Sequence, residues 1–82
     1  MERLYKLINL PIGSKFKYLT KGVESETFEV LNFKTKRKIG GYYINDKYQY
    51  DIEMVPVKRA VRNTKTGYVH YFKLTRDVKW VL

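Results

Sequence analysis

The sequence predicts a mainly β fold: a small, curled antiparallel barrel preceded by a short N-terminal helix. Apolar and polar residues alternate in segments that recur about every eight to twelve residues, a spacing typical of small barrels and sandwiches. Turn-forming residues separate these segments, and the alternation is that of half-buried strands. A chain of 82 residues is long enough for one hydrophobic core, so we expect a single domain over residues 1–82.

The N-terminal segment differs from the rest because its apolar residues follow a helical spacing. Leu4, Leu7 and Ile8 stand at positions i, i+3 and i+4, which lie on one face of a helix. Pro11 would end such a helix. We therefore expect a helix within residues 2–10 that packs its apolar stripe on the sheet, with a terminal strand as the alternative.

Two strands are expected next, over residues 15–20 and 27–33, with a turn at Lys21–Gly22 between them. Side chains in a strand alternate between its two faces. The first strand therefore places Phe16 and Tyr18 on one face, and the second places Phe28 and Val30 on one face.

A glycine pair, Gly40–Gly41, interrupts the next strand pattern. Glycines inside a strand indicate a bulge, a sharp bend or the close approach of another backbone. Their backbone N–H groups could also hold a phosphate, but the spacing matches no phosphate-binding loop. A bend in a tightly curled sheet is the favoured interpretation.

The residues after the glycine pair predict a hairpin. Asn45–Lys47 is the expected loop, and residues 48–54 show the cleanest alternation in the chain. Its apolar face, which we expect to meet the core, consists of Tyr48, Tyr50, Ile52 and Met54. Pro56 should mark a strand edge or a break, because proline cannot donate a ladder hydrogen bond.

Three further strands are expected towards the C-terminus, over residues 57–62, 68–74 and 78–82. A strong turn signal at Asn63–Gly67 separates the first two. Because the loops are short and the chain is small, we prefer an SH3-like barrel over an OB-like one.

The composition indicates a polyanionic partner. Seventeen Lys and Arg residues against eight Asp and Glu give a formal net charge of +9, and such an excess attracts polyanions. The chain has no cysteine, which fits a reducing compartment, and no apolar run long enough for a membrane span or signal peptide. We expect a cytoplasmic protein without a membrane partner.

Catalytic chemistry finds little support in the sequence. The only histidine, His70, lies within an aromatic strand pattern, where a structural role is expected. Asp51 and Glu53 share a strand face that alternation turns to solvent. We therefore expect a protein that is not an enzyme, with no catalytic residue, no metal site and no cofactor.

The candidate binding residues form two basic segments and an adjoining tyrosine pair. Tyr42 and Tyr43 are neighbours on one strand, so they should point to opposite faces, and at least one should lie outside the core. Lysine and arginine neutralise phosphates, and exposed tyrosines stack on bases. The predicted nucleic-acid-binding residues are Lys34, Lys36, Arg37 and Lys38 in the first basic segment, the pair Tyr42 and Tyr43, and Lys58, Arg59, Arg62 and Lys65 in the second basic segment.

The favoured function is therefore non-enzymatic nucleic-acid binding, either DNA-binding or RNA-binding. A small adaptor or inhibitor, of the kind found among viral and mobile-element accessory proteins, is the alternative. It would use the same basic residues against an acidic surface of another protein. The sequence leaves the strandedness of the nucleic acid and the oligomeric state open.

Overall fold

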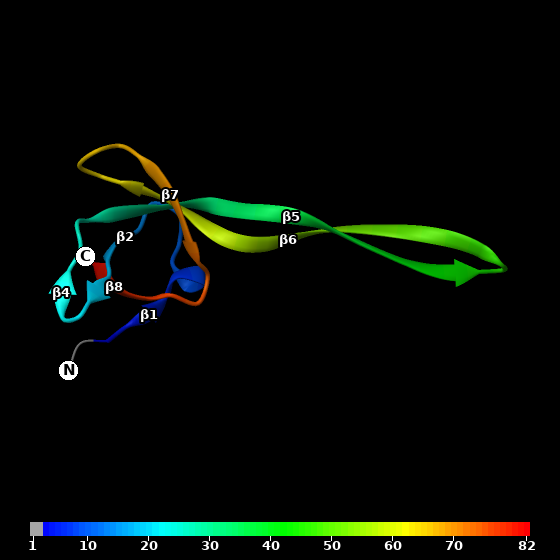
Figure 1. Cartoon of the computed structure of the whole chain (residues 1–82), viewed down its shortest axis with the longest axis horizontal. Coiled ribbons are helices and arrows are strands. Elements are labelled where there is room, and N and C mark those ends of the chain that lie inside the picture. Colours follow the sequence, from blue (N-terminus) through cyan, green and yellow to red (C-terminus); the bar gives the residue numbers. More distant parts are fainter. Residues whose placement is uncertain (1–2) are drawn as a thin grey trace.

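The computed structural model describes residues 3–82, which form a curled β-sheet body and one long hairpin arm (Figure 1). The molecule measures 58 × 29 × 21 Å along its principal axes, and the arm accounts for its elongated shape. The elements are β1 (Tyr5–Lys6), η1 (Leu7–Asn9), β2 (Lys15–Lys17), β3 (Leu19–Thr20), β4 (Val23–Glu24), β5 (Phe28–Ile44), β6 (Lys47–Asn63), β7 (Val69–Lys73) and β8 (Asp77–Val81).

Six of these strands form one antiparallel sheet in the order β1-β8-β2-β5-β6-β7. The short strands β3 and β4 pair with each other, joined by a tight turn in which Lys21 and Gly22 both have positive φ. The predicted turn at these two residues is confirmed. Asn63 stabilises the second predicted turn, because its Oδ1 accepts hydrogen bonds from the amides of Lys65 and Thr66.

The core lies inside the curl of the body. Phe16 and Val61 are completely buried, and the ring of Phe28 stacks on that of Phe16 with centroids 5.7 Å apart. Each such side chain contributes about 1.5–3 kcal/mol when it is removed from water. Phe16 belongs to this core, as do Phe28 and Val30, which were predicted to share a face, and the other buried apolar residues among residues 3–82 are Leu7, Leu10 and Val78.

The predicted N-terminal helix is wrong. Of residues 2–10, Glu2 lies outside the described part, and the others form β1, the single 3₁₀ turn η1 and irregular backbone. The amides of Leu7 and Ile8 donate to the carbonyls of Arg76 and Leu74, each at 2.9 Å. These hydrogen bonds to the β7–β8 connection stabilise so short a segment more than isolated helical turns would, because helix nucleation is unfavourable.

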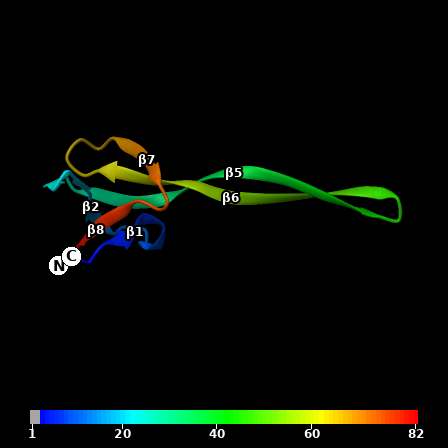
Figure 2. The ribbon, with the colours of Figure 1, turned by 60° about the horizontal axis from the view of Figure 1, so that its bottom comes forward.

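The predicted closed barrel, SH3-like or OB-like, is also wrong. Within residues 3–82 the two edge strands, β1 and β7, do not pair with each other, so the sheet curls without closing. The amides of η1 bridge part of the gap through their bonds to Leu74 and Arg76. Much of the strand content lies instead in β5 and β6, which extend far beyond the curl (Figures 1 and 2).

The arm is the outer part of the β5–β6 hairpin, from Thr35 to Pro56. Its strands pair without interruption out to Ile44 opposite Lys47. Asn45 and Asp46 form the two-residue loop with φ of 50° and 63°, the conformation that a tight hairpin requires and that Asn and Asp tolerate. The predicted hairpin is confirmed. Pro56 does not break β6, because every second N–H of a two-stranded ribbon points to solvent.

Two expectations for this region fail. The residues Tyr48, Tyr50, Ile52 and Met54 do share one face, but that face is between 44% and 74% exposed and does not meet the core. Gly40 and Gly41 lie in regular pairing, without a bulge. The register shifts fall between Val30 and Phe33 and between Lys34 and Thr35, where the arm leaves the body.

Candidate functional site

A row of three lysines crosses the sheet at the base of the arm. Lys58 on β6 lies directly opposite Lys34 on β5 and, on its other side, directly opposite Lys73 on β7. Residues opposite each other in an antiparallel sheet share a face, with Cβ atoms about 4.5–5.5 Å apart. We call Lys34, Lys58 and Lys73 the lysine row.

The lysine row is electrostatically uncompensated. Like charges directly opposite each other destabilise a sheet, and within residues 3–82 no carboxylate lies within 4.0 Å of any of these three ammonium groups. By contrast, the carboxylates of the body are paired: Asp77 with Lys6, Glu24 with Lys17 and Lys79, Glu29 with Arg62, and Glu26 with Lys65. An anion from outside the chain would relieve the repulsion in the row.

Aromatic and polar groups surround the lysine row. The Lys34 ammonium lies 4.8 Å from the ring centroid of Tyr71, a contact that holds the charge above an exposed ring. Beside β7, an open hollow of about 500 Å³ is lined by Lys58 and Lys73 together with Arg76 and Thr75, as well as by Tyr71, Phe72 and Asp77. Several cations therefore lie beside a concave surface at the base of the arm.

The first predicted basic segment continues from the lysine row onto the arm. Lys36 and Lys38 share one face of β5, Arg37 points to the other, and all three are exposed. Lys38 lies opposite Glu53 on β6. With Lys34, these residues place four cations along one stretch of strand next to the row.

The second predicted basic segment does not form one site. Arg62 and Lys65 each lie beside a carboxylate, with closest N···O distances of 3.5 Å to Glu29 and 3.8 Å to Glu26. Lys58 alone of this segment belongs to the lysine row.

Arg59, a further member of the second segment, is buried rather than exposed. Its side chain is buried beneath the point where the arm begins, with 2% of the residue accessible to solvent. Its Nε donates to the carbonyl of Leu31 at 2.9 Å and its Nη1 to that of Ile8 at 3.4 Å, while its Cζ lies 4.1 Å from the Phe33 ring centroid. Burial lowers the pKa of this guanidinium below its usual value. Arg59 therefore ties β5 and the N-terminal segment to β6, and we assign it a structural role.

The two tyrosines of the predicted site lie near the tip of the arm. Tyr42 pairs with Gln49 and Tyr43 with Tyr48, so the two point to opposite faces, and both are exposed. The ring of Tyr43 contacts the edge of Tyr48, with centroids 5.0 Å apart. Only Tyr42 shares a face with Lys36 and Lys38.

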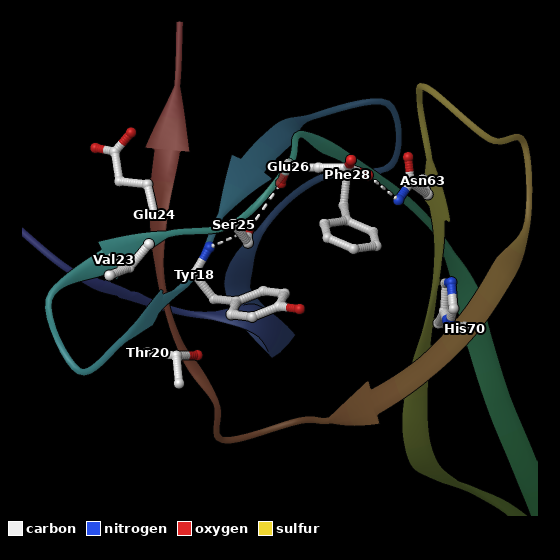
Figure 3. A pocket seen from close by; sticks show the side chains of 9 residues that line it. All are labelled: Tyr18, Thr20, Val23, Glu24, Ser25, Glu26, Phe28, Asn63 and His70. Atoms are coloured by element: carbon white, nitrogen blue, oxygen red, sulfur yellow. Dashed lines mark hydrogen bonds between the residues drawn. The ribbon is translucent and has the colours of Figure 1, made fainter.

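A second hollow, of about 430 Å³, lies at the end of the body farther from the arm, and its lining includes His70 (Figure 3). Its polar groups bond to one another: the Tyr18 amide donates to Ser25 Oγ, Ser25 Oγ to the Glu26 carbonyl, and Asn63 Nδ2 to Glu26 Oε2 at 2.7 Å. In the view of Figure 3, His70 and Glu24 lie on opposite sides of the hollow. These contacts describe a structural network, and they bring no base to a nucleophile.

Sequence reasoning missed Lys73 and Tyr71. Their alternation with Phe72 was visible in the sequence, but their position beside Lys58 depends on the β6–β7 register, which the turn at Asn63–Gly67 sets. The position of Lys73 beside Lys58 can be recognised only once β6 and β7 are aligned.

Comparison with known proteins gives no relative: no family model, no curated protein and no solved structure matches the chain. Among residues 3–82, no three His, Cys, Asp or Glu side chains are grouped so that they could hold a metal ion. The same residues contain no helix of the length and apolarity needed to cross a membrane.

Proposed function

We propose that the protein is a non-enzymatic nucleic-acid-binding protein that holds backbone phosphates at the base of its hairpin arm. The lysine row is the observation that supports this function. Like charges on directly opposite residues of a sheet are unfavourable, and among residues 3–82 no carboxylate lies within 4.0 Å of these three ammonium groups, so phosphates bound along the row would reduce the repulsion. The cytoplasmic location expected from the sequence stays a prediction.

The neighbouring residues would extend the contact along the arm. Lys36 and Lys38 lie on the same strand as Lys34, two and four residues farther out. Tyr71 beside the row and Tyr42 on the face of Lys36 and Lys38 are exposed rings that could stack on bases or riboses. Arg59 is left out of the contact because it is buried, and Arg62 and Lys65 because carboxylates already accompany them.

The test is a binding titration with mixed-sequence DNA and RNA, single- and double-stranded, by fluorescence anisotropy at several salt concentrations. Log affinity falls linearly with log salt concentration, and each phosphate contact adds about 0.7–0.9 to the steepness of that fall. Replacing two lysines of the row, Lys58→Gln with Lys73→Gln, should weaken binding and reduce that slope by about 2.

The matched control is Lys15→Gln with Lys21→Gln, which removes the same charge from two exposed lysines of the body, outside both the row and the arm. Equal losses in both double variants would show that binding follows net charge alone, against a site at the row. Absence of binding to every nucleic acid at about 50 mM salt would contradict the function itself. The row would then be better explained by the alternative partner, an acidic protein surface.

A further inference from the structure

The arm has one apolar face that no part of residues 3–82 covers. The strand register places six residues there, in directly opposite or neighbouring positions of β5 and β6, and we call them the apolar arm face: Ile39, Tyr43, Tyr48, Tyr50, Ile52 and Met54. Tyr48 is the least exposed of them, at 44%, and Tyr43 and Tyr50 are 74% exposed. The other face of the arm is mostly polar, with Lys36, Lys38, Gln49, Asp51 and Glu53.

The side chains of the apolar arm face support one another. The Tyr48 ring lies across Gly41, so that a Cβ at position 41 would collide with it. Tyr48 also meets Tyr43 and Tyr50 edge to face, with centroids 5.0 and 4.8 Å away. Binding would therefore cost little side-chain entropy, because rings already held by neighbours lose few rotamers.

The face is large enough for a stable contact. Aromatic side chains bury about 150–250 Å² each, so three tyrosines and three aliphatic side chains at these exposures offer on the order of 700 Å². That exceeds the largest apolar patch of a typical monomer, about 300–600 Å². It approaches the roughly 800 Å² per partner of a standard protein interface.

The charges at the two ends of the face point to its occupant. Arg37 lies on the same face near the base of the arm, opposite Met54, whereas Asp46 is in the loop at the tip. About eight residues of strand separate them, or roughly 26 Å, so they cannot pair within one arm. Two arms stacked face to face and antiparallel would bring Arg37 of each beside Asp46 of the other.

We propose that two copies of this chain associate through their apolar arm faces, with antiparallel arms, to form a two-fold symmetric dimer. Such an interface is self-complementary, with isoleucines and tyrosines at its centre and the Arg37–Asp46 pairs at its rims. Nucleic acid fits this face less well. Its aliphatic residues cannot stack on bases or bind phosphates, and its tyrosine rings already meet edge to face.

The dimer does not rest on nucleic-acid binding, because the lysine row lies outside the apolar arm face. Variants of the row should leave the dimer unchanged, and variants of the face should leave the phosphate contacts of a single chain unchanged. Failure of one proposal can therefore be told from failure of the other.

The test is sedimentation equilibrium of the full chain without nucleic acid, from about 1 μM to about 1 mM. We expect the average mass to rise from one chain to two. The double variant Ile39→Thr/Ile52→Thr should raise the dissociation constant at least about tenfold, with an unchanged far-UV circular dichroism spectrum. A single-chain mass over the whole range, or a dimer that the double variant leaves intact, would overturn the proposal.

Matched controls lie on the other face of the same arm. Ile44→Thr and Tyr42→Ser replace exposed apolar residues there, and each should change the dissociation constant less than about twofold. Asp46→Asn should raise it about two- to fivefold, whereas Asp51→Asn on the polar face should not. If the isoleucine variant fails to fold, Gly41→Ala, which displaces the Tyr48 ring, replaces it. Gly40→Ala, whose added methyl meets open space, is then the control.

Discussion

The body and the arm share the same alternation of apolar and polar residues, but the apolar face is buried in the body and exposed in the arm. In the body, alternating residues of β5 and β6 such as Phe28, Val30 and Val61 are buried against Phe16 and the curl of the sheet. In the arm, equally regular alternation from Tyr48 to Met54 leaves the apolar face exposed, because no second layer formed by the described residues lies opposite it. Alternation therefore determines which side chains share a face, and only packing determines whether that face is buried.

The two regions also differ in their charges. The body pairs its own carboxylates with cations, as in Glu24 with Lys79 at 2.7 Å. At the base of the arm, the lysine row has no such partner among the described residues. The body thus buries a core and pairs its carboxylates, whereas the arm has an exposed apolar face and its base has a row of lysines with no carboxylate partner among residues 3–82.

The largest expected effect tests whether stability resides in the body. Leu7→Ala should lower the free energy of unfolding by about 2–5 kcal/mol, because Leu7 is completely buried and its loss leaves a cavity. Ile52→Ala in the arm should change it by less than about 0.5 kcal/mol. Urea unfolding at low micromolar concentration measures both. A comparable loss in the two variants would show that the arm packs against something in the folded chain.

A smaller effect should separate the two arginines that the sequence placed in basic segments. Arg59→Met removes the donors to the carbonyls of Leu31 and Ile8, and should cost about 1–3 kcal/mol of unfolding free energy. Arg37→Met, on the exposed arm, should leave the thermal midpoint of dilute protein nearly unchanged. If Arg59→Met is as stable as the original chain, the buried guanidinium is not a structural tie.

The smallest effect concerns acid. Hydrogen bonding and attraction to Lys79, with a further contribution from Lys17, hold the pKa of Glu24 below its ordinary value of 4.5. A lowered pKa in the folded state means that Glu24 stabilises the body above about pH 4.5 and that this stabilisation is lost as the pH falls through the lowered value. In Glu24→Gln, stability should fall less steeply with acid over this window than in the unchanged chain. Parallel curves from thermal melts between about pH 5 and pH 3 would contradict the role of the Glu24–Lys79 pair.

Local signals in the sequence were sufficient for the turns and for the faces of the strands. Asn45 and Asp46 tolerate positive φ, so the hairpin could be predicted from those two residues and their neighbours. The helical spacing of Leu4, Leu7 and Ile8 was misleading, because the hydrogen bonds that fix this segment come from Leu74 and Arg76. Of the predicted site residues, Arg59 and Lys58 are adjacent in sequence, yet only Lys58 is available to a ligand.

By itself, the sequence determined a strongly basic, mainly β chain, the positions of its turns, and which residues of each strand share a face. These properties depend on composition, on local backbone preferences and on the two-residue period of a strand. Tertiary structure alone decided that the sheet stays open, that β5 and β6 extend as an arm, and that Lys34, Lys58 and Lys73 meet in a row. Those outcomes depend on register between strands and on what packs opposite each face, and both are set by contacts between residues far apart in the chain.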